Sequence, residues 1–499
     1  MSQTLLMESL LGQTRLAVIE DGEVCELYVR RPDSENLSGN IYLGRVENVL
    51  PGMNAAFVDI GRDKNGFLSA ARLPSEVQGD RTLAERAKKR RIESVARPGR
   101  SILVQVLKSE GGAKGPQLSC NISLPGRLMV LLDGVPYAGV SRKIEDPGER
   151  ERLRQLGREL TEGKDLGVIL RTAANGASES ALVEEFTRLS ERLDELHRAA
   201  EHAAAPRLIH DDNALELKAV RDRLKDGVDV LWAEGEPLYR RLKALAEEHA
   251  PDYAERVRLH DGATPLFDLY SVDTAVDKAL QKYVWLKDGG SLVIEETEAL
   301  TVVDVNTGKN VGKRSAEETV FKTNCLAARE LMRQLRLRDI AGIVIVDFID
   351  MASEDHKSAV LEELRGCAAR DGNRTRVLGF TGLGLVELTR KRERLPLKRQ
   401  LMHTCSDCGG NGVVPSHETT ARRAVRELWR RRRGGNEGPL LVEAAPQVVS
   451  RLKAIGASKG GSTYARPDES LKADEFRVSP VDANALPEGC ATLKQRECL

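Results

Sequence analysis

The stretch that most constrains the fold is residues 301–351, which opens with TVVDVNTG and closes with GIVIVDFIDM. Each end is an apolar run that finishes in an acidic residue, Asp304 in the first and Asp347 in the second. Continuous apolar runs of this kind are typical of strands that are buried on both faces. Residues 316–337 between them have helical composition and spacing, so the pattern predicts a strand, a helix and a second strand parallel to the first.

The two acidic residues are then expected to emerge at one edge of the sheet, together with Asn306. Carboxylate and amide oxygens make a hard site of the kind that Mg²⁺ prefers, with retained waters and often a substrate phosphate. A metal in such a site can position a water and stabilise charge on a phosphodiester. Either Asp alone could equally be a turn residue or a helix cap, but the pair with Asn306, Gly308 and Lys309 favours a site.

Three segments of this region resemble the bacterial RNase E/RNase G family of endoribonucleases: DVNTG, the run EETVFKTNCLAARELMRQLRLRDIAGIVIVDFIDM, and GLVELTRKR at residues 384–392. The resemblance is collinear from about residue 10 to about residue 415, and TRKR with the short C-terminal part is more similar to RNase G than to full-length RNase E. It implies a DNase I-like catalytic domain over residues 281–400, in which Asp304 and Asp347 bind the catalytic Mg²⁺ and Asn306 orients the site.

Composition limits the class of protein. The chain has 76 Lys and Arg against 76 Asp and Glu, so a uniformly basic coat is excluded but local basic patches are not. No apolar run approaches the roughly 20 residues of a membrane helix, and no signal peptide is recognisable. The eight cysteines are scattered, with only Cys405 and Cys408 closely paired. A multidomain α/β protein of the reducing cytoplasm, without a membrane partner, is expected.

The N-terminal residues predict two further modules. Residues 14–30 form two alternating runs around Asp21-Gly22, which predicts a hairpin that must join a later part of the chain. The resemblance implies that residues 1–37 and 215–280 together form an RNase H-like subdomain. Several short strands separated by Gly and Pro over residues 38–120 suit a small barrel such as an OB-fold.

An OB-fold binds single-stranded nucleic acid by stacking bases on aromatic rings beside a basic groove. Phe57 and Phe67 are the candidate rings, and Lys108 and Lys114 are candidate contacts to the RNA backbone. Each Phe could instead be ordinary core, but NAAFVDIG and NGFL resemble the family's RNA-binding barrel. The KKRR run at residues 88–91 could contact phosphates, although a solvated loop or helix face is the favoured interpretation.

Residues 121–214 contain three apolar runs that predict strands: ISLPGRLMVLL, GVSRKIED and LGVILRTAANGAS. Arg171 and Thr172 follow GVIL directly, and a guanidinium with a hydroxyl suits a monophosphate pocket. From the residues alone, Arg171 could be an ordinary surface arginine. The resemblance implies a 5′-monophosphate sensor, in which Gly126, Val130 and Arg142 complete the pocket. Residues 181–260 are predicted to be mostly helical.

The C-terminal part carries a basic cluster and a cysteine pair. Arg390, Lys391 and Arg392 are expected to hold the RNA backbone, although a solvated basic turn is the alternative. Cys405 and Cys408 have the spacing of half a zinc ribbon. His403 and His417 could complete that site within one chain, or the pair could be redox-active or metal-free.

The resemblance instead implies that two chains share one Zn²⁺ through this pair, over residues 401–416. Residues 417–480 are then a small α/β dimerisation domain, and residues 481–499 are expected to be disordered. The implied assembly is a homodimer, with a tetramer as the alternative.

Together with the resemblance, these features predict a Mg²⁺-dependent endoribonuclease that cleaves single-stranded, A/U-rich RNA. The resemblance implies that the products carry 5′-phosphate and 3′-hydroxyl ends. A 5′-monophosphate is expected to stimulate the enzyme, its expected substrates are ribosomal RNA precursors and decaying mRNA, and DNA is not an expected partner. The alternative is a non-catalytic RNA-binding protein of the same fold. A structural protein is disfavoured because the sequence has no long coiled coil or repeat.

Overall fold

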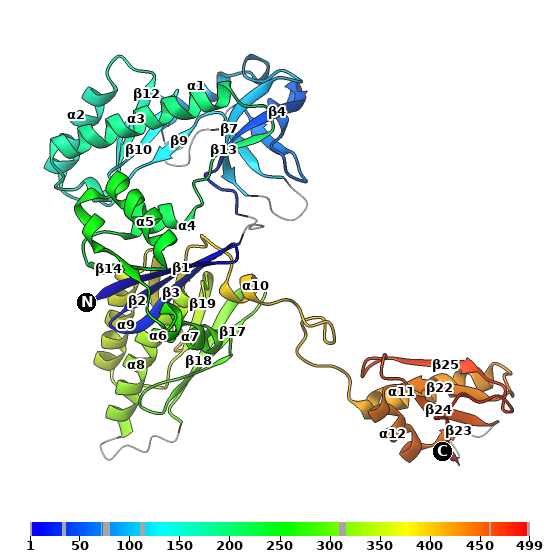
Figure 1. The fold of residues 1–499 in the computed structure, drawn as a ribbon. Helices are drawn as coiled ribbons and strands as arrows, with labels where there is room; N and C mark the ends of the chain where they lie inside the picture. Colours follow the sequence, from blue (N-terminus) through cyan, green and yellow to red (C-terminus); the bar gives the residue numbers. More distant parts are fainter. Residues whose placement is uncertain are drawn as a thin grey trace. The chain divides into compact units, whose positions relative to one another are not determined.

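The protein is described by a computed structural model that divides into two compact units, Met1–Leu397 and Lys398–Leu499 (Figure 1). The predicted mixed α/β architecture with several sheets is confirmed. In the ranges that are described, no helix is both long and apolar enough to span a bilayer. Those ranges are residues 2–31, 36–70, 72, 80–109, 115–308, 316–458 and 461–496.

The N-terminal sheet joins both ends of a long excursion of the chain. Its first three strands form an antiparallel meander, and the turn at Asp21-Gly22 has φ of 48° and 84°, the conformation of a tight hairpin. β1 then pairs in parallel with β14, and β14 with β15, so the order is β15-β14-β1-β2-β3. The strands are β1 (Gln3–Leu10), β2 (Gln13–Glu20), β3 (Glu23–Arg30), β14 (Val228–Glu234) and β15 (Val257–His260).

The mostly helical prediction for residues 181–260 is wrong in three places, because β13 (Arg207–His210), β14 and β15 lie in that segment. Each is short, and β13 and β14 pair with strands far away in the sequence, so local helical composition outweighs their signal. The helical parts are α3 (Glu179–Glu201), α4 (Leu215–Lys218), the π-helical segment Ala219–Arg223 and α5 (Glu236–His249). The following α6 and α7 span Leu266–Leu269 and Val272–Ala279.

The predicted small barrel is confirmed. Its five strands pair in the closed cycle β4-β5-β6-β8-β7-β4, and β13 is added beside β4. Helix α1 (Arg81–Lys89) lies between β6 and β7 in the sequence. The strands are β4 (Ile41–Leu50), β5 (Ala55–Asp59), β6 (Gly66–Ser69), β7 (Ser101–Lys108) and β8 (Gln117–Ser119).

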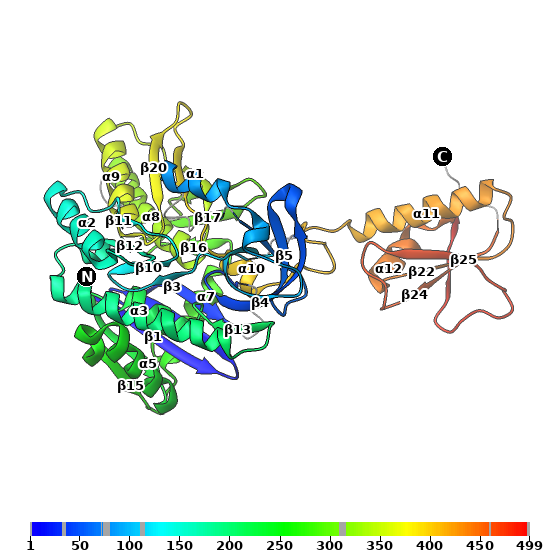
Figure 2. The same cartoon turned by 90° about the horizontal axis from the view of Figure 1, so that it is seen from above.

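A separate sheet in the order β11-β12-β10-β9 follows the barrel, with α2 (Pro147–Thr161) packed against β11 and β12. Helix α3 lies against β10 and β13 (Figure 2). The run ISLPGRLMVLL, predicted as one strand, is two antiparallel strands that turn at residues 126–128. The strands are β9 (Ser123–Pro125), β10 (Met129–Asp133), β11 (Ala138–Val140) and β12 (Leu166–Leu170).

The stretch at residues 301–351 forms the predicted strand, helix and parallel strand: β18 (Leu300–Asn306), α8 (Ala316–Leu337) and β19 (Gly342–Asp347). They belong to a sheet in the order β16-β17-β18-β19-β21-β20, whose inner face packs on α8 and α9 (Glu354–Arg370) (Figure 1). The remaining strands are β16 (Tyr283–Trp285), β17 (Ser291–Glu296), β20 (Thr375–Phe380) and β21 (Val386–Arg390).

The prediction that these strands are buried on both faces is wrong. The side chains alternate along β18, and Val302 and Ile343 on the outer face are 40% and 49% exposed. Both helices of the unit pack on the opposite, inner face of the sheet. The apolar residues of these runs are therefore buried on the inner face and partly exposed on the outer face. We call this outer face the open face.

The second unit contains α11 (His417–Arg433), α12 (Pro446–Ile455) and the sheet β25-β22-β24-β26. The expectation that residues 481–499 are disordered is wrong for residues 481–496. β26 (Ala491–Thr492) pairs with β24 (Thr463–Pro467), and Leu493 is 2% exposed within the apolar core of this unit. The other strands are β22 (Leu440–Ala444), β23 (Ala457–Ser458), β25 (Phe476–Pro480) and β27 (Gln495–Arg496).

A buried ionic cluster ties the N-terminal sheet to helix α8. Arg336 donates from Nη2 to Glu26 Oε1 over 2.7 Å and from Nη1 to Glu20 Oε2 over 2.7 Å. Glu26 also pairs with Arg223 over 2.7 Å. Burial alone would raise the pKa of the Glu26 carboxyl, but Arg223 and Arg336 outweigh it and hold that pKa below its usual value.

We therefore expect Arg336→Met to lower the free energy of unfolding by about 3–5 kcal/mol at neutral pH, because Glu20 and Glu26 lose their common partner. The loss should shrink as the pH falls toward 4, since protonation neutralises the carboxylates that have lost Arg336. Urea denaturation at several pH values measures this. Arg365→Met, an exposed arginine on α9, is the control and should change stability by less than about 0.5 kcal/mol. Equal losses in both variants would contradict the assignment.

Candidate functional site

The parallel pairing of β18 with β19 makes Asp304 and Asp347 register partners. Neighbouring strands lie about 4.8 Å apart, so the two exposed carboxylates are adjacent on the open face. Asn306 Nδ2 donates to Asp304 Oδ2 over 2.8 Å, which fixes the orientation of that carboxylate. The structure thus brings together the three residues predicted to form the site.

This donor set fits Mg²⁺. It offers two carboxylates and an amide, and the described residues contain no group of three or more His, Cys, Asp or Glu that could enclose an ion. Mg²⁺ characteristically takes few protein ligands and keeps several waters or substrate phosphates. The open position on the sheet therefore leaves room for those ligands.

Two aromatic side chains that were not predicted from the sequence share the open face. Tyr283 and Trp285 on the edge strand β16 are 56% and 74% exposed. Tyr283 lies opposite Val293, which lies opposite Asp304, and Trp285 lies opposite Ser291, which lies opposite Asn306. Residues opposite each other in a sheet point to the same face. The alternation of two aromatic residues around buried Val284 was the available signal.

The barrel carries a second aromatic surface. Phe57 and Phe67 are register partners, and their ring centroids are 5.9 Å apart at 66°, an edge-to-face contact. Phe57 is exposed and Phe67 is half-buried, and neither belongs to the apolar core of the barrel. Lys108 is exposed at the end of β7, and Lys114 lies outside the described residues.

The predicted phosphate pocket gathers at the end of β12. Arg171 follows the strand directly and donates from Nη1 to the Gly126 carbonyl. Thr172 Oγ1 lies 3.0 Å from the Ser141 hydroxyl, beside exposed Arg142. Val130 lies within β10, where it pairs with Pro125 and Ile169 in the ladder.

The turn that carries Gly126 is held by a buried carboxylate. Glu185 on α3 accepts hydrogen bonds from the Leu128 and Met129 amides, and burial raises the pKa of its carboxyl. A Cβ on Gly126 would lie 2.0 Å from Glu185 Oε1, so only glycine fits here. The Gly126 carbonyl is thereby fixed where Arg171 can reach it.

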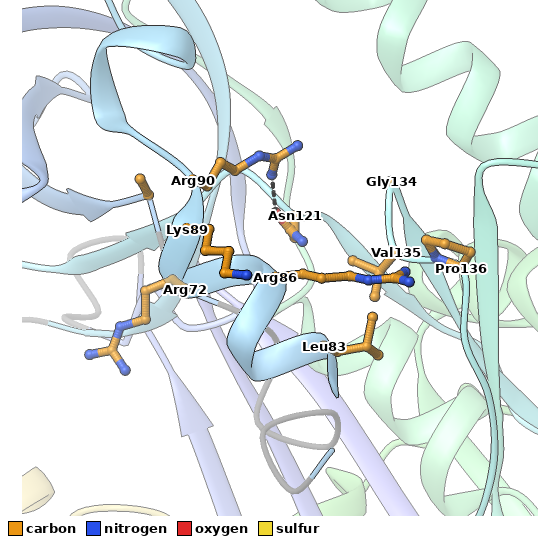
Figure 3. Close-up of a pocket in the computed structure, with 10 residues that line it drawn as sticks. Arg72, Leu83, Arg86, Lys89, Arg90, Asn121, Gly134, Val135 and Pro136 are labelled. Atoms are coloured by element: carbon orange, nitrogen blue, oxygen red, sulfur yellow. Dashed lines mark hydrogen bonds between the residues drawn. The ribbon is translucent and has the colours of Figure 1, made fainter. Parts of the chain in front are cut away.

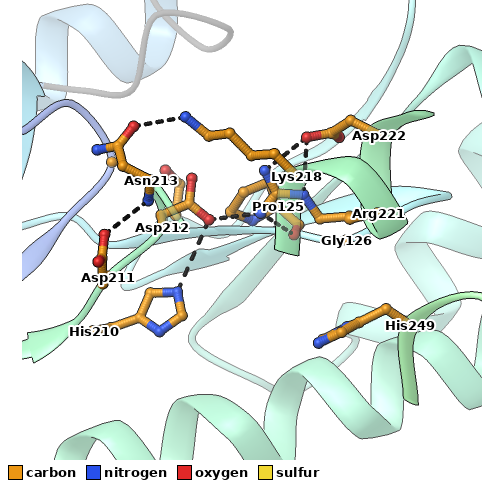
Figure 4. A network of polar contacts seen from close by, with 12 residues as sticks. Pro125, Gly126, His210, Asp211, Asp212, Asn213, Lys218, Arg221, Asp222 and His249 are labelled. Atoms are coloured by element: carbon orange, nitrogen blue, oxygen red, sulfur yellow. Dashed lines mark hydrogen bonds and ion pairs between the residues drawn. The ribbon is translucent and has the colours of Figure 1, made fainter. Parts of the chain in front are cut away.

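A polar network near Gly126 includes Asp222 and Arg221 (Figure 4), and Asp222 is also an acidic partner for Arg171. Asp222 accepts from Arg171 Nη1 over 3.0 Å and from Arg221 Nη2 over 2.8 Å. Arg221 is buried and also donates to Asp212 over 2.6 Å. Burial opposes ionisation of Asp222, but Arg221 and Arg171 outweigh it and keep its pKa below the usual value. Asp222 was missed because its partner is distant in the sequence.

The basic cluster after β21 is only partly available to a ligand. The prediction that Arg390 contacts the RNA backbone is wrong, because its guanidinium is buried. It donates to Asp371 over 2.7 Å and to the Ile340 carbonyl over 3.2 Å. Arg390 is the last residue of a strand, and its side chain points inward to the segments that carry these two acceptors. Lys391 is exposed and pairs with Glu393 over 3.1 Å, and Arg392 is exposed.

The predicted cysteine pair lies in a turn whose backbone amides contact the Cys408 sulfur. The Gly412 amide donates to Cys408 Sγ over 3.3 Å, and amide donors from Gly412 and Gly410 lower the pKa of the Cys408 thiol. A thiolate stabilised in this way suits Zn²⁺. Within the described residues, His403 and His417 do not gather with the pair into a group of three ligands.

Comparison with known proteins identifies the family to which this chain belongs. Residues 123–393 match the model of the Ribonuclease E/G family. The chain is 37% identical over 456 residues to Ribonuclease G of Escherichia coli (strain K12), covering 91% of this chain and 93% of that protein. It is 38% identical over 452 residues to Ribonuclease G of Haemophilus influenzae, covering 90% and 91%. Ribonuclease E of E. coli K12 is 34% identical over 429 residues, 85% of this chain and 40% of that protein. The chain belongs to the Ribonuclease E/G family.

The burial of Arg390 predicts that its replacement lowers stability much more than replacement of the exposed Arg392. Arg390→Met should lower the free energy of unfolding by about 3–5 kcal/mol, because it leaves the Asp371 carboxylate buried and unpaired. Arg392→Met should change stability by less than about 0.5 kcal/mol. Urea denaturation measures both. If Arg390→Met were as stable as the parent protein, the buried ion pair would be excluded.

Proposed function

We propose that this endoribonuclease of the Ribonuclease E/G family hydrolyses single-stranded, A/U-rich RNA at the open face of the β18–β19 pair. The observation that carries the proposal is the parallel register that sets Asp304 beside Asp347. These two carboxylates would hold Mg²⁺, and Asn306 orients Asp304. When bound, the ion would position a water and neutralise charge on the phosphodiester.

In the proposed hydrolysis, the water oxygen forms a bond to phosphorus and the bond from phosphorus to the 3′ oxygen breaks. The 3′ oxygen takes a proton, so the products carry a 5′-phosphate and a 3′-hydroxyl. The residues of this chain bind and align the strand across the open face. The exposed rings of Tyr283 and Trp285 offer stacking surfaces for the bases next to the acidic pair.

The barrel would hold RNA beside the cut. Base stacking on aromatic rings contributes about 1–3 kcal/mol per base and tolerates any sequence. Phe57 and Phe67 supply that surface, with Lys108 and Lys114 as contacts to the backbone. Lys391 and Arg392 are proposed backbone contacts near the catalytic sheet, without Arg390.

A 5′-monophosphate is proposed to bind at Arg171 and Thr172, with Gly126, Val130 and Arg142 around them. Asp222 already pairs with Arg171, so a phosphate must compete with this carboxylate for the guanidinium. The stimulated enzyme would act on ribosomal RNA precursors, at their 5′ ends, and on mRNA in decay.

The wider architecture is proposed to follow the family. The order β15-β14-β1-β2-β3, with β1, β14 and β15 parallel, supports an RNase H-like subdomain, and the closed barrel supports an OB-fold. The sheet over α8 and α9 would be the DNase I-like catalytic domain. Cys405 and Cys408 would share one Zn²⁺ with a second chain, which gives a cytoplasmic homodimer or, through further contacts, a tetramer.

The competing candidate is an RNA-binding protein without catalysis. Replacing Asp347 by Asn distinguishes the two, because it removes one ligand charge and keeps the shape. Cleavage of a short A/U-rich RNA in Mg²⁺ should fall by more than about 100-fold, while RNA binding persists. Asp350→Asn, an exposed carboxylate three residues further on, is the control and should cleave normally. Unchanged cleavage by Asp347→Asn would exclude the site.

The 5′-end pocket predicts a difference between two RNAs of one sequence, carrying either a 5′-monophosphate or a 5′-hydroxyl. Arg171→Ala should reduce the ratio of their cleavage rates toward one, since it removes a charge-assisted hydrogen bond worth about 1.5–3 kcal/mol. Arg154→Ala on α2, which removes a partly exposed arginine, should keep the ratio of the parent. A preference that survives Arg171→Ala would rule out this pocket.

A further inference from the structure

A cavity of about 350 Å³ lies between helix α1 and the turn that joins β10 to β11 (Figure 3). It is formed where the barrel meets the β11-β12-β10-β9 sheet, and it is separate from the acidic pair and from the Arg171 pocket. Its walls are Ala70, Arg72, Leu83, Arg86, Lys89, Arg90, Asn121, Gly134, Val135 and Pro136.

Helix α1 is fixed at both ends, so the cavity has a defined shape. Asp80 Oδ1 accepts from the Leu83 amide over 3.0 Å at the start of the helix. Asn54 donates to the Arg90 carbonyl over 2.8 Å and accepts from the Ile92 amide over 2.7 Å just after its end. Leu83 packs on an apolar group around Leu132 and Val135. The barrel helix is thereby docked on the neighbouring sheet.

The cavity gathers positive charge. Among the described residues that line it, four are cationic and none is acidic. Arg72 donates to the Gln117 amide oxygen, and Arg90 donates to Asn121 Oδ1 over 3.3 Å. Within the described part of the chain, none of the four makes an ion pair. Clustered like charges repel each other, and an anion with several oxygens relieves that repulsion.

The walls suit phosphate groups better than bases. A guanidinium can donate two parallel hydrogen bonds to a phosphate, and none of the described lining residues carries an aromatic ring for stacking. Among these described residues the only neutral polar side chain is that of Asn121, whose Oδ1 already accepts from Arg90. A ligand would therefore be recognised through its backbone charge and without regard to sequence.

The cavity also continues from the aromatic surface of the barrel. Arg72 contacts Gln117, and Gln117 is the register partner of Phe67. A strand whose bases stack on Phe57 and Phe67 would lead its backbone toward Arg72. The KKRR run, for which a solvated face was the favoured interpretation, supplies Lys89 and Arg90 to this cavity.

We propose that the cavity binds successive phosphates of the single-stranded RNA that the barrel holds, as a site that anchors substrate independently of its 5′ end. The proposal rests on the proposed function in assigning RNA as the ligand. A free polyphosphate offers the same chemistry, so the experiment has a separate arm for it.

The test is the salt dependence of binding for a 5′-hydroxyl RNA of about 16 nucleotides, in an Asp347→Asn background that prevents cleavage. For single-stranded RNA, removing one interaction between a cation and a phosphate lowers the slope of log K against log salt by about 0.7. Arg86→Ala with Lys89→Ala should therefore reduce the slope by about 1.4 and weaken binding by about 10-fold at low salt. Both side chains are exposed on α1, and neither has a described hydrogen bond to lose.

A matched pair, Arg158→Ala with Arg198→Ala, removes two exposed arginines from α2 and α3 outside the cavity. It should keep the slope and the affinity within about two-fold, and equal losses in both pairs would overturn the proposal. Lys89→Arg keeps the charge and should keep the slope. These single variants test the proposal even if the double variant folds poorly. An unchanged slope for Lys89→Arg together with a lower slope for Lys89→Gln supports it.

Inorganic tripolyphosphate provides the other arm. If the double variant loses tripolyphosphate binding but keeps the RNA slope, the cavity is a polyphosphate site and the proposal is wrong. Cleavage by the unmodified protein in Mg²⁺ is followed in parallel. Loss of slope without any cleavage by that protein would remove the nuclease assignment and keep the RNA site. Cleavage by the unmodified protein, with an unchanged slope in the double variant, would keep the nuclease assignment and remove the RNA site in this cavity.

Discussion

The carboxylate of Glu26 is the contact on which the first unit depends most. It sits buried on β3 and accepts from Arg336 on α8, from Arg223 at the end of the π-helical segment, and from the Tyr28 hydroxyl. A buried carboxylate without partners costs several kcal/mol, so these segments must meet for the chain to fold. The same π-helical segment carries Asp222, and α8 backs the sheet that carries the acidic pair. One side chain therefore links the packing of both proposed sites.

The most local features were those that could be predicted from the sequence. The hairpin at Asp21-Gly22 and helix α8 each follow from a pattern of fewer than about 25 adjacent residues. The meeting of Asp304 with Asp347 follows from the strand, helix, strand pattern of residues 301–351 and a rule of sheet geometry. The short barrel strands were recognisable because Gly and Pro separate them. Strand β14 was hidden because it pairs with β1, more than 200 residues away, and β15 because it is short and pairs with β14.

Burial was harder to predict than secondary structure. The apolar runs of β18 and β19 suggested strands covered on both faces, but an apolar residue on a sheet does not report which face has a helix over it. Arg390 was predicted to contact a ligand because it lies in a basic run, yet its charge is cancelled by Asp371, 19 residues away. The pairing of Arg171 with Asp222 and the walls of the basic cavity likewise bring distant segments together, so no single spacing reveals them. The aromatic pair of β16 did leave a local signal, the alternation of Tyr283 and Trp285 around buried Val284.

In the proposed 5′-end pocket, the pairing of Arg171 with Asp222 limits the free energy that a bound phosphate can gain. Because the guanidinium already has a charged partner, a phosphate that binds gains only the difference between two ionic contacts. Such a pocket holds a 5′ end weakly by itself. It becomes effective when the same strand is already bound elsewhere on the protein, since tethering raises the local concentration of the end to about the millimolar range. The 5′ end then acts as the second contact of a bivalent ligand, and its preference should disappear for fragments too short to reach both contacts.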